Sequence, residues 1–234
     1  MKCALNARLL SAAELTRQDA TFADIGTDHA YLPLFLLEGG RIKNAFCSDI
    51  NEGPLASARR NALERGLIDK IEFILTDGAA TLDGRGITDY AICGMGGELI
   101  ADIISRAPHL MDGRINLILQ PMSRQAHLRS FLAKSGFEVK CESYSFDAGK
   151  YYVCLLATYT GVSRDIDGIE AELGSPAAAY LGNEQRIGYL QAILKARKRA
   201  CEGKRLGGVA SPDEEKLIYA LESLLSTLEG RMIK

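Results

Sequence analysis

Acidic residues stand where three apolar runs of the sequence give way to glycine turns. Asp28 follows Gly26 in the first turn, Asp49 closes the next apolar run, and Asp77 precedes Gly78. A strand, a glycine turn, a helix and then an acid about 20 residues farther on are typical of a doubly wound fold that binds a nucleoside, because the carboxylate accepts hydrogen bonds from the ribose hydroxyls. The pattern predicts that these five residues line one crevice for a nucleoside-bearing cofactor.

Asp28 distinguishes the first turn from the dinucleotide fingerprint G-x-G-x-x-G. It replaces the second glycine, which lets the backbone approach a pyrophosphate. A carboxylate repels a diphosphate, whereas S-adenosylmethionine carries the adenosine without phosphate and adds an ammonium and a sulfonium group. The charge therefore favours S-adenosylmethionine over NAD or FAD. Asp77 is the candidate acceptor for the adenine amine, although an Asp-Gly pair also forms turns without binding a ligand.

Two further loops follow apolar runs. The first, Cys93-Gly94-Met95-Gly96-Gly97, lets the backbone come close to a ligand, and no Gly-Lys-Ser/Thr follows to make it a phosphate-binding loop. Its expected occupants are the methionine end of the cofactor and a substrate base, the alternative being a flexible turn. The second loop begins Gln120-Pro121-Met122. Gln120 either bonds a base edge or caps its own backbone.

Other chemistries find little support. His29 either acts as an acid or base or only packs at the start of a helix, while His109 and His127 have no supporting neighbours. The spacing of histidines and cysteines matches no metal site, and neither a Cys–His nucleophile nor a Gly-x-Ser-x-Gly motif is present.

The elements that must position these residues alternate between strands and helices. Five short apolar runs are expected to be buried parallel strands, separated by segments of helical length: Thr21–Ile25, Ala45–Cys47, Ile71–Leu75, Tyr90–Cys93 and Ile115–Leu119. Two extended runs, Phe137–Phe146 and Tyr151–Tyr159, flank a tight turn and predict an antiparallel hairpin. The predicted fold class is α/β, a Rossmann-like sheet of the class I methyltransferase type, mostly parallel with an antiparallel C-terminal hairpin.

Helices are expected at both ends of this sheet domain. Residues 3–16, which include Arg8, have the apolar spacing of an amphipathic helix. Beyond residue 160 the composition changes to helix formers, and Ser211-Pro212-Asp213-Glu214 is typical of a helix start. Leucines 217, 221, 224 and 228 form a short coiled-coil seam, and the apolar residues 187, 190, 194 and 201 form a partner stripe. With a reversal at 206–209, the sequence predicts a methyltransferase domain over 1–160 and an appended helical coiled-coil hairpin over 161–234.

Basic residues gather near the end of the first tail helix. The cluster is Lys195, Arg197, Lys198, Arg199, Lys204 and Arg205. It is either a solvated helix face or a surface that binds the phosphates of a nucleic acid. A second patch could form from Arg8, Lys43, Arg59, Arg60 and Arg65.

Composition and charge narrow the class of protein. The 234 residues carry a formal net charge of -2, so binding to a polyanion depends on a local basic patch. Six cysteines form no C-x-x-C pair, which is typical of reduced thiols in a cytoplasmic protein. No apolar run approaches the length of a membrane span, and the first residues lack a signal-peptide core. No feature predicts a protein partner.

Three strings resemble the bacterial TrmK family, whose members methylate N1 of adenine 22 in tRNA. They are Ala-Asp-Ile-Gly-Thr-Asp-His-Ala-Tyr-Leu-Pro at 23–33, Gly-Met-Gly-Gly at 94–97 and Leu-Gln-Pro at 119–121. The resemblance covers roughly residues 3–160 and extends more loosely into the tail. It implies S-adenosylmethionine as donor, tRNA as acceptor and a cytoplasmic enzyme. Met122 stands where relatives often have asparagine, which places the amide role on Gln120.

Together, the residues and the resemblance give a set of expected site residues. The cofactor-binding residues are Arg8, Asp24, Gly26, Asp28, His29, Asp49, Ile50, Asp77, Gly78, Gly94, Met95 and Gly96. The substrate-binding residues are Gly97, Met122, Lys195, Lys198 and Arg199. The catalytic residues are Asp28, Gln120 and Pro121.

The expected reaction is a direct displacement. Adenine N1 has a free lone pair at neutral pH, so no general base is required and the protein supplies alignment and electrostatic support. Two other functions fit the sequence: a methyltransferase for another RNA or a small metabolite, and a non-catalytic RNA-binding protein with a vestigial cofactor site.

Overall fold

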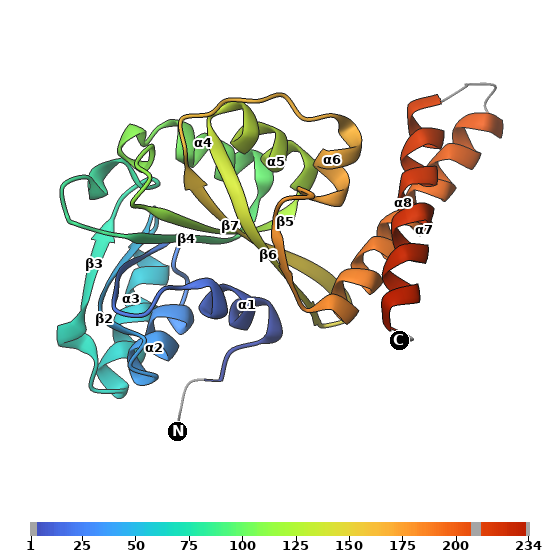
Figure 1. Cartoon of the computed structure of the whole chain (residues 1–234). Helices are drawn as coiled ribbons and strands as arrows, with labels where there is room; N and C mark the ends of the chain where they lie inside the picture. The colour runs from blue at the N-terminus through green and yellow to red at the C-terminus, as the bar shows by residue number, and fades with distance from the viewer. Residues whose placement is uncertain (1–3, 207–211, 233–234) are drawn as a thin grey trace.

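A mixed sheet of eight strands forms the centre of the protein in the computed structural model, which describes residues 4–206 and 212–232 (Figure 1). The strand order is β3-β2-β1-β4-β5-β7-β6-β8. The strands are β1 (Ala20–Ile25), β2 (Ile42–Asp49), β3 (Ile71–Leu75), β4 (Asp89–Gly96), β5 (Asn116–Ser123), β6 (Phe137–Asp147), β7 (Lys150–Tyr159) and β8 (Ala179–Leu181). The five predicted parallel strands are confirmed, and each is longer than its apolar run or equal to it.

The predicted hairpin is also confirmed. β7 pairs antiparallel with both β5 and β6, so β6 runs in the same direction as β5. β8, which the sequence did not reveal, adds a short parallel strand beside β6. The turn between β6 and β7 therefore lies at the carboxyl edge of the sheet, where the parallel strands β1 to β5 also end.

Helices cover both faces of the sheet (Figure 1). α1 (Ala7–Leu15), α2 (Tyr31–Glu38) and α3 (Glu52–Glu64) lie on one face, and α4 (Gly97–Ser105), α5 (Gln125–Lys134) and α6 (Gly168–Leu173) on the other. Alternate residues of β1 serve the two cores: Phe22 packs in the cluster with α2, and Ile25 packs in the cluster with α4. The helix expected over 3–16 is shorter, because the side chain of Asn6 caps it by accepting a hydrogen bond from the backbone N–H of Leu9 at 2.9 Å.

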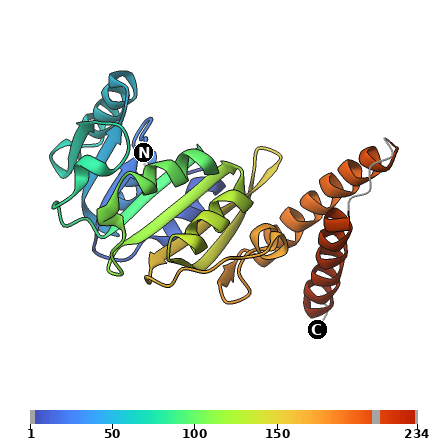
Figure 2. The ribbon, with the colours of Figure 1, turned by 90° about the horizontal axis from the view of Figure 1, so that it is seen from above.

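The tail forms the expected helical hairpin. α7 (Asn183–Leu206) and α8 (Pro212–Met232) stand beside the sheet domain and pack against each other (Figure 2). Leu221 is fully buried between them, which places the leucine seam within one chain. Leu225 is more deeply buried than the predicted seam residue Leu224, because the α8 stripe meets the sheet domain as well as α7. The predicted reversal at 207–209 and the cap residue Ser211 lie outside the described residues.

A buried ion pair joins the tail segment to the sheet. The guanidinium of Arg129 on α5 donates to the carboxylate of Glu142 on β6 at 2.8 Å, and both side chains are almost completely buried. Arg129 also donates to the backbone carbonyl of Ala171 in α6 at 3.0 Å, and the hydroxyl of Tyr144 donates to Glu142. These bonds fix α6 against α5 and β6, so residues 161–182 are packed onto the sheet. The domain division at residue 160 stays a prediction.

Among residues 4–206 and 212–232, no helix combines the length and the apolar character that crossing a membrane requires.

Candidate functional site

The turn after β1 is held in place from two sides. The backbone N–H groups of Gly26 and Thr27 both donate to the carbonyl of Ser48 on β2 at 2.8 Å. The hydroxyl of Thr27 donates to the carboxylate of Asp24 at 2.6 Å. Asp24 is buried, and burial raises its pKa to about 6, with a further contribution from the charge of Asp49 and an opposing one from the Thr27 hydrogen bond. Asp24 therefore shapes the turn from below.

The backbone conformation of Gly26 favours glycine, and the Met95 side chain packs against it. Its φ is +74°, in the left-handed region, and a Cβ on this residue would lie 2.0 Å from the terminal methyl of Met95. The Met95 side chain thus lies directly over the turn. The structure thus brings the glycine-rich end of β4 to the turn after β1, two segments that the sequence predicted on the cofactor side.

Asp28 and His29 lie at the outer side of the turn. The Asp28 side chain is 76% exposed, and its carboxylate is 3.3 Å from Nε2 of His29. The His29 ring stacks on Tyr31, with 5.1 Å between centroids, and its backbone carbonyl accepts from Asn61 at 3.0 Å. Both side chains are accessible from the crevice, and His29 also packs at the start of α2.

The acids at the ends of β2 and β3 differ in their surroundings. Asp49 is half-buried and accepts a hydrogen bond from the backbone N–H of Asn51 at 2.8 Å, while the neighbouring Ile50 is 63% exposed. Asp77 forms an ion pair with Arg106 at 2.8 Å, and this hydrogen bond lowers the pKa of Asp77. Arg106, at the end of α4, was missed by sequence reasoning because its distance of 29 residues from Asp77 gives no local signal.

The crevice beside the first turn has a volume of about 230 Å³. It is lined by Asn6, Arg8, Leu9, Asp24, Gly26, Thr27, Asp28, His29, Ala30, Tyr31, Leu32 and Cys93. Seven of these residues were not predicted: Asn6, Leu9, Thr27, Ala30, Tyr31, Leu32 and Cys93. The start of α1 forms one wall, which only the packing of this helix against the sheet could reveal.

Larger hollows exist elsewhere on the described residues, and the position of one of them disfavours it as a cofactor site. One of about 590 Å³ lies between the segments that precede β4 and β5, at the amino edge of the sheet. In open α/β sheets, ligands bind at the carboxyl edge. Asp112 and Arg114, which line this hollow, form an ion pair with each other at 2.6 Å.

Gln120 connects three elements. Its side-chain carbonyl accepts from the guanidinium of Arg8 on α1 at 2.6 Å and from the backbone N–H of Gly94 at 3.1 Å. Its amide donates to the carbonyl of Pro121 at 3.3 Å, and the side chain is fully buried. Of the two roles predicted for Gln120, the observed geometry has it capping backbone. Its contacts set the position of the Gly94 loop.

The two loops expected to face a substrate base touch each other. A Cβ on Gly97 would lie 2.5 Å from the backbone carbonyl oxygen of Arg124, so only glycine fits there. Arg124 adopts φ +58°, a conformation rare for residues with a side chain. Pro121 is buried, and Met122 is 44% exposed beside this contact. The close fit fixes these two loops against each other at the carboxyl ends of β4 and β5, a region that we call the mouth of the site.

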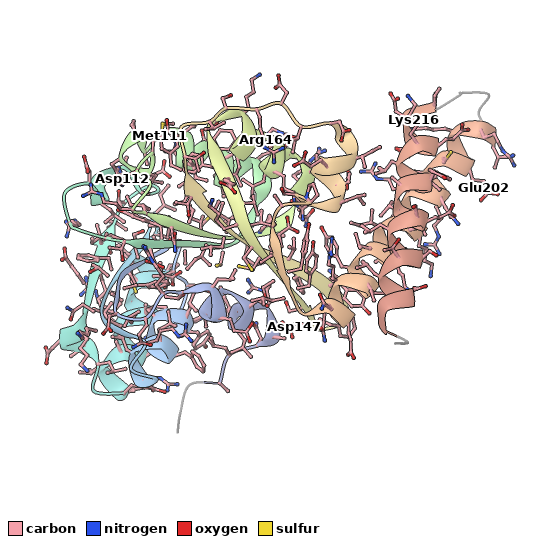
Figure 3. All side chains as sticks on the ribbon, in the orientation of Figure 1. Met111, Asp112, Asp147, Arg164, Glu202 and Lys216 are labelled. Carbon is pink, nitrogen blue, oxygen red and sulfur yellow. The ribbon has the colours of Figure 1, made fainter. Side chains whose placement is uncertain are left out.

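The predicted tail residues lie apart from this mouth. Gly188 of α7 lies against Tyr151 of the sheet. Lys195 and Arg199 lie farther along the same helix, about 11 and 17 Å beyond Gly188. Figure 3 shows the nearby Glu202 at the far end of the helix. Lys198 forms an ion pair with Glu222 of α8 at 2.6 Å. Lys195 and Arg199 have no ion-pair partner within the parts of the chain that the structure describes.

Comparisons with known proteins agree with this geometry. Residues 5–155 match the model of a family described as "Methyltransferase domain". The tRNA (adenine(22)-N(1))-methyltransferase of Bacillus subtilis is 32% identical over 187 residues, which cover 80% of this chain and 79% of that protein.

Solved structures match over nearly the whole chain. Sp1610 of Streptococcus pneumoniae in complex with S-adenosyl-L-methionine has a TM-score of 0.79 and 30% identity, and the match covers 95% of this chain and all of that one. TrmK of M. capricolum in complex with S-adenosyl-homocysteine has a TM-score of 0.72 and 26% identity over 97% of each chain. The chain belongs to the TrmK family of class I, S-adenosylmethionine-dependent methyltransferases.

Proposed function

We propose that the protein transfers a methyl group from S-adenosylmethionine to N1 of adenine 22 in tRNA, in the cytoplasm. The observation that carries this proposal is the crevice at the carboxyl edge, which Asp28 lines, with Asp49 at the end of β2 and Asp77 just after β3 at the same edge. Such a border suits a cationic adenosine donor and repels a diphosphate. The acceptor is supported by the identity to the B. subtilis enzyme.

The residues around the crevice fit the cofactor. The turn at Gly26 has the positive φ that favours glycine, and Asp49 stands at the position that bonds ribose hydroxyls in this fold. The exposed side chain of Ile50 offers an apolar surface for the adenine ring. Asp77, held ionised by Arg106, accepts a hydrogen bond from the adenine amine. Arg8, in the wall of the crevice, meets the carboxylate end.

The chain's own part in the reaction is alignment and charge. When bound, S-adenosylmethionine supplies an electrophilic methyl group, and adenine N1 reacts without prior loss of a proton. Gln120 fixes the Gly94 loop through its bond to that backbone N–H, and the Gly97–Arg124 contact fixes the second loop. Asp28 stabilises the positive charge at the mouth, because its exposed carboxylate adjoins the turn.

The target adenine must leave the tRNA stack to reach the crevice, at a cost of a few kcal/mol. Met122, exposed beside the two loops, contacts the extruded base. Lys195 and Arg199 bind phosphates at a distance from the mouth, where a large RNA reaches both regions.

The test is transfer of a labelled methyl group to unmodified tRNA that carries adenine or guanine at position 22. We expect labelling of the adenine form alone, and equal labelling of both forms would contradict the proposed acceptor.

A second measurement addresses the two alternatives. Titration calorimetry with S-adenosylmethionine should show binding that Asp49→Ala weakens at least 10-fold, whereas Asp165→Ala, at an exposed acid away from the crevice, leaves it unchanged. Absence of binding would favour a non-catalytic RNA-binding protein. Binding without transfer to tRNA would favour another acceptor.

A further inference from the structure

Two aromatic rings are exposed at the tip of the β6–β7 hairpin. Phe146 and Tyr151 are cross-strand neighbours in the register, and their ring centroids are 4.6 Å apart. Phe146 is 49% exposed and Tyr151 is 37% exposed. Hairpin tips are usually polar, so a pair of large rings at this place requires an explanation.

The tip lies at the same edge of the sheet as the candidate site. Its turn projects from the sheet as a yellow loop in Figure 2, and Asp147 marks it in Figure 3. β5 and β7 pair up to Leu119↔Leu155, and toward this edge β5 continues for four residues and β7 for five. If the β5–β7 register is extended, Tyr151 is level with Ser123. Ser123 is the last residue of β5, next to the loop that is expected to face the substrate base.

The rings are held by packing. A Cβ on Gly188 of α7 would lie 2.2 Å from the Tyr151 ring, so α7 makes room for this ring by having glycine. On β6, two residues before Phe146, Tyr144 packs edge-on against Tyr189 of α7, with 5.2 Å between centroids. Tyr151 is therefore braced against α7. Because packing already holds these rings in place, they lose little conformational entropy when a ligand binds to them.

Charge next to the rings suits a nucleic acid. Lys150 is exposed and has no ion-pair partner among the residues that the structure describes, although Asp147 stands opposite it in the turn. Two rings are too small an area for a stable protein interface, which needs about 800 Å² on each side. The exposed surface of the two rings is about the size of one nucleobase.

We propose that Phe146 and Tyr151 form a stacking platform for an unpaired base of the RNA substrate, adjacent to the base that enters the crevice. The proposal deepens the proposed function and rests on it. Extruding one base leaves neighbours unstacked, and aromatic side chains stack on such bases without reading their sequence. Lys150 neutralises a phosphate next to the stacked base.

The test compares Phe146→Ala, Phe146→Leu and Phe146→Trp with Tyr219→Leu, which alters an exposed ring on α8. We expect KM for tRNA to rise roughly 5- to 100-fold in the alanine and leucine variants. The tryptophan variant should retain the wild-type KM, and the control should be unchanged. Calorimetry with S-adenosylmethionine and thermal unfolding should match wild type in all four variants, since Phe146 lies outside the crevice.

A direct readout separates this proposal from the proposed function. tRNA that carries 2-aminopurine next to position 22 should lose fluorescence on binding wild type and lose less on binding Phe146→Leu. If wild type fails to methylate tRNA, the proposed function falls, and the fluorescence still decides the platform. Wild-type tRNA affinity and fluorescence in both Phe146→Ala and Phe146→Leu would overturn the platform. A change confined to sedimentation would also overturn it and assign the rings to contact between protein chains.

Discussion

At the scale of single residues, the carboxylates of the site divide into two kinds. Asp28 and Asp77 are exposed, and they interact with His29 and Arg106 respectively. Asp24 is buried beneath the turn and accepts the Thr27 hydroxyl. The sequence places all of them near one crevice, but their different roles follow from burial. An exposed acid offers charge to a ligand, and a buried one shapes the backbone at a cost in stability.

The raised pKa of Asp24 predicts how the free energy of unfolding depends on pH. Its folded pKa of about 6 is above the ordinary 3.8, so folding favours the protonated form. The protonated carboxyl contributes stability that is present below pH 3.8 and lost as the pH rises to about 6, by about 3 kcal/mol in total. Asp24→Asn lacks this titration. We therefore expect the free energy of unfolding of the variant, relative to wild type, to increase by up to that amount between pH 4 and pH 7.

Urea unfolding at several pH values measures this difference. Carboxyls that do not interact with Asp24 titrate alike in the two proteins, so their contributions cancel. A constant difference between pH 4 and pH 7 would show that Asp24 has an ordinary pKa in the folded state.

At the scale of elements, polar side chains buried between helices and strands fix the geometry. Arg8 and Gln120 connect α1, the end of β4 and β5 beside the mouth. Arg129 and Glu142 connect α5, β6 and α6. None of these pairs has a periodic or local sequence signal, because the partners are 112 and 13 residues apart. Their contact depends on how the elements pack.

The buried pair gives a second prediction. Arg129→Met leaves the Glu142 carboxylate buried without a cation, and the free energy of unfolding should fall by about 3–5 kcal/mol. The double variant Arg129→Met/Glu142→Leu removes both charges and should recover most of this loss. Chemical denaturation measures both values. If the double variant were as unstable as the single one, lost packing would be the cause rather than an unpaired charge.

At the scale of the whole molecule, the helical hairpin carries its basic residues away from the mouth. α7 contacts the sheet at Gly188 and then extends beyond it, as Figure 1 shows. The cluster predicted from the sequence is divided: Arg197 bonds Glu172 and Glu214, Lys198 bonds Glu222, and Lys195 and Arg199 remain for a ligand. Substitution of Lys198 would therefore disturb the α7–α8 contact as well as any RNA contact.

The third prediction concerns these two cations. Lys195→Glu/Arg199→Glu should weaken tRNA binding about 10-fold or more and reduce the slope of log affinity against log salt by about 2, because two phosphate contacts are lost. S-adenosylmethionine affinity should not change. Lys216→Glu, on the exposed side of α8, serves as the control. Equal tRNA affinity and salt slope in the double variant and wild type would make this surface a solvated helix face.

The sequence by itself determined the local features of the protein. These are the glycine turns and acids at the strand ends, the closing hairpin and the leucine-rich tail. These features are local, since short apolar runs, glycines and heptad spacing act over a few residues. It also identified the family, through three short strings that the matching structures confirm.

Only the tertiary structure decided which charges are free, which are paired and which walls close the crevice. The wall from Asn6 to Leu9, the Arg106–Asp77 pair and the Gly97–Arg124 contact join segments far apart in the chain. α6 and β8 also escaped prediction, because their short sequences are stabilised by neighbours and not by their own periodicity. The physical reason is common to all: burial and pairing are properties of packed elements, and a side chain's energy depends on neighbours that the linear sequence does not show.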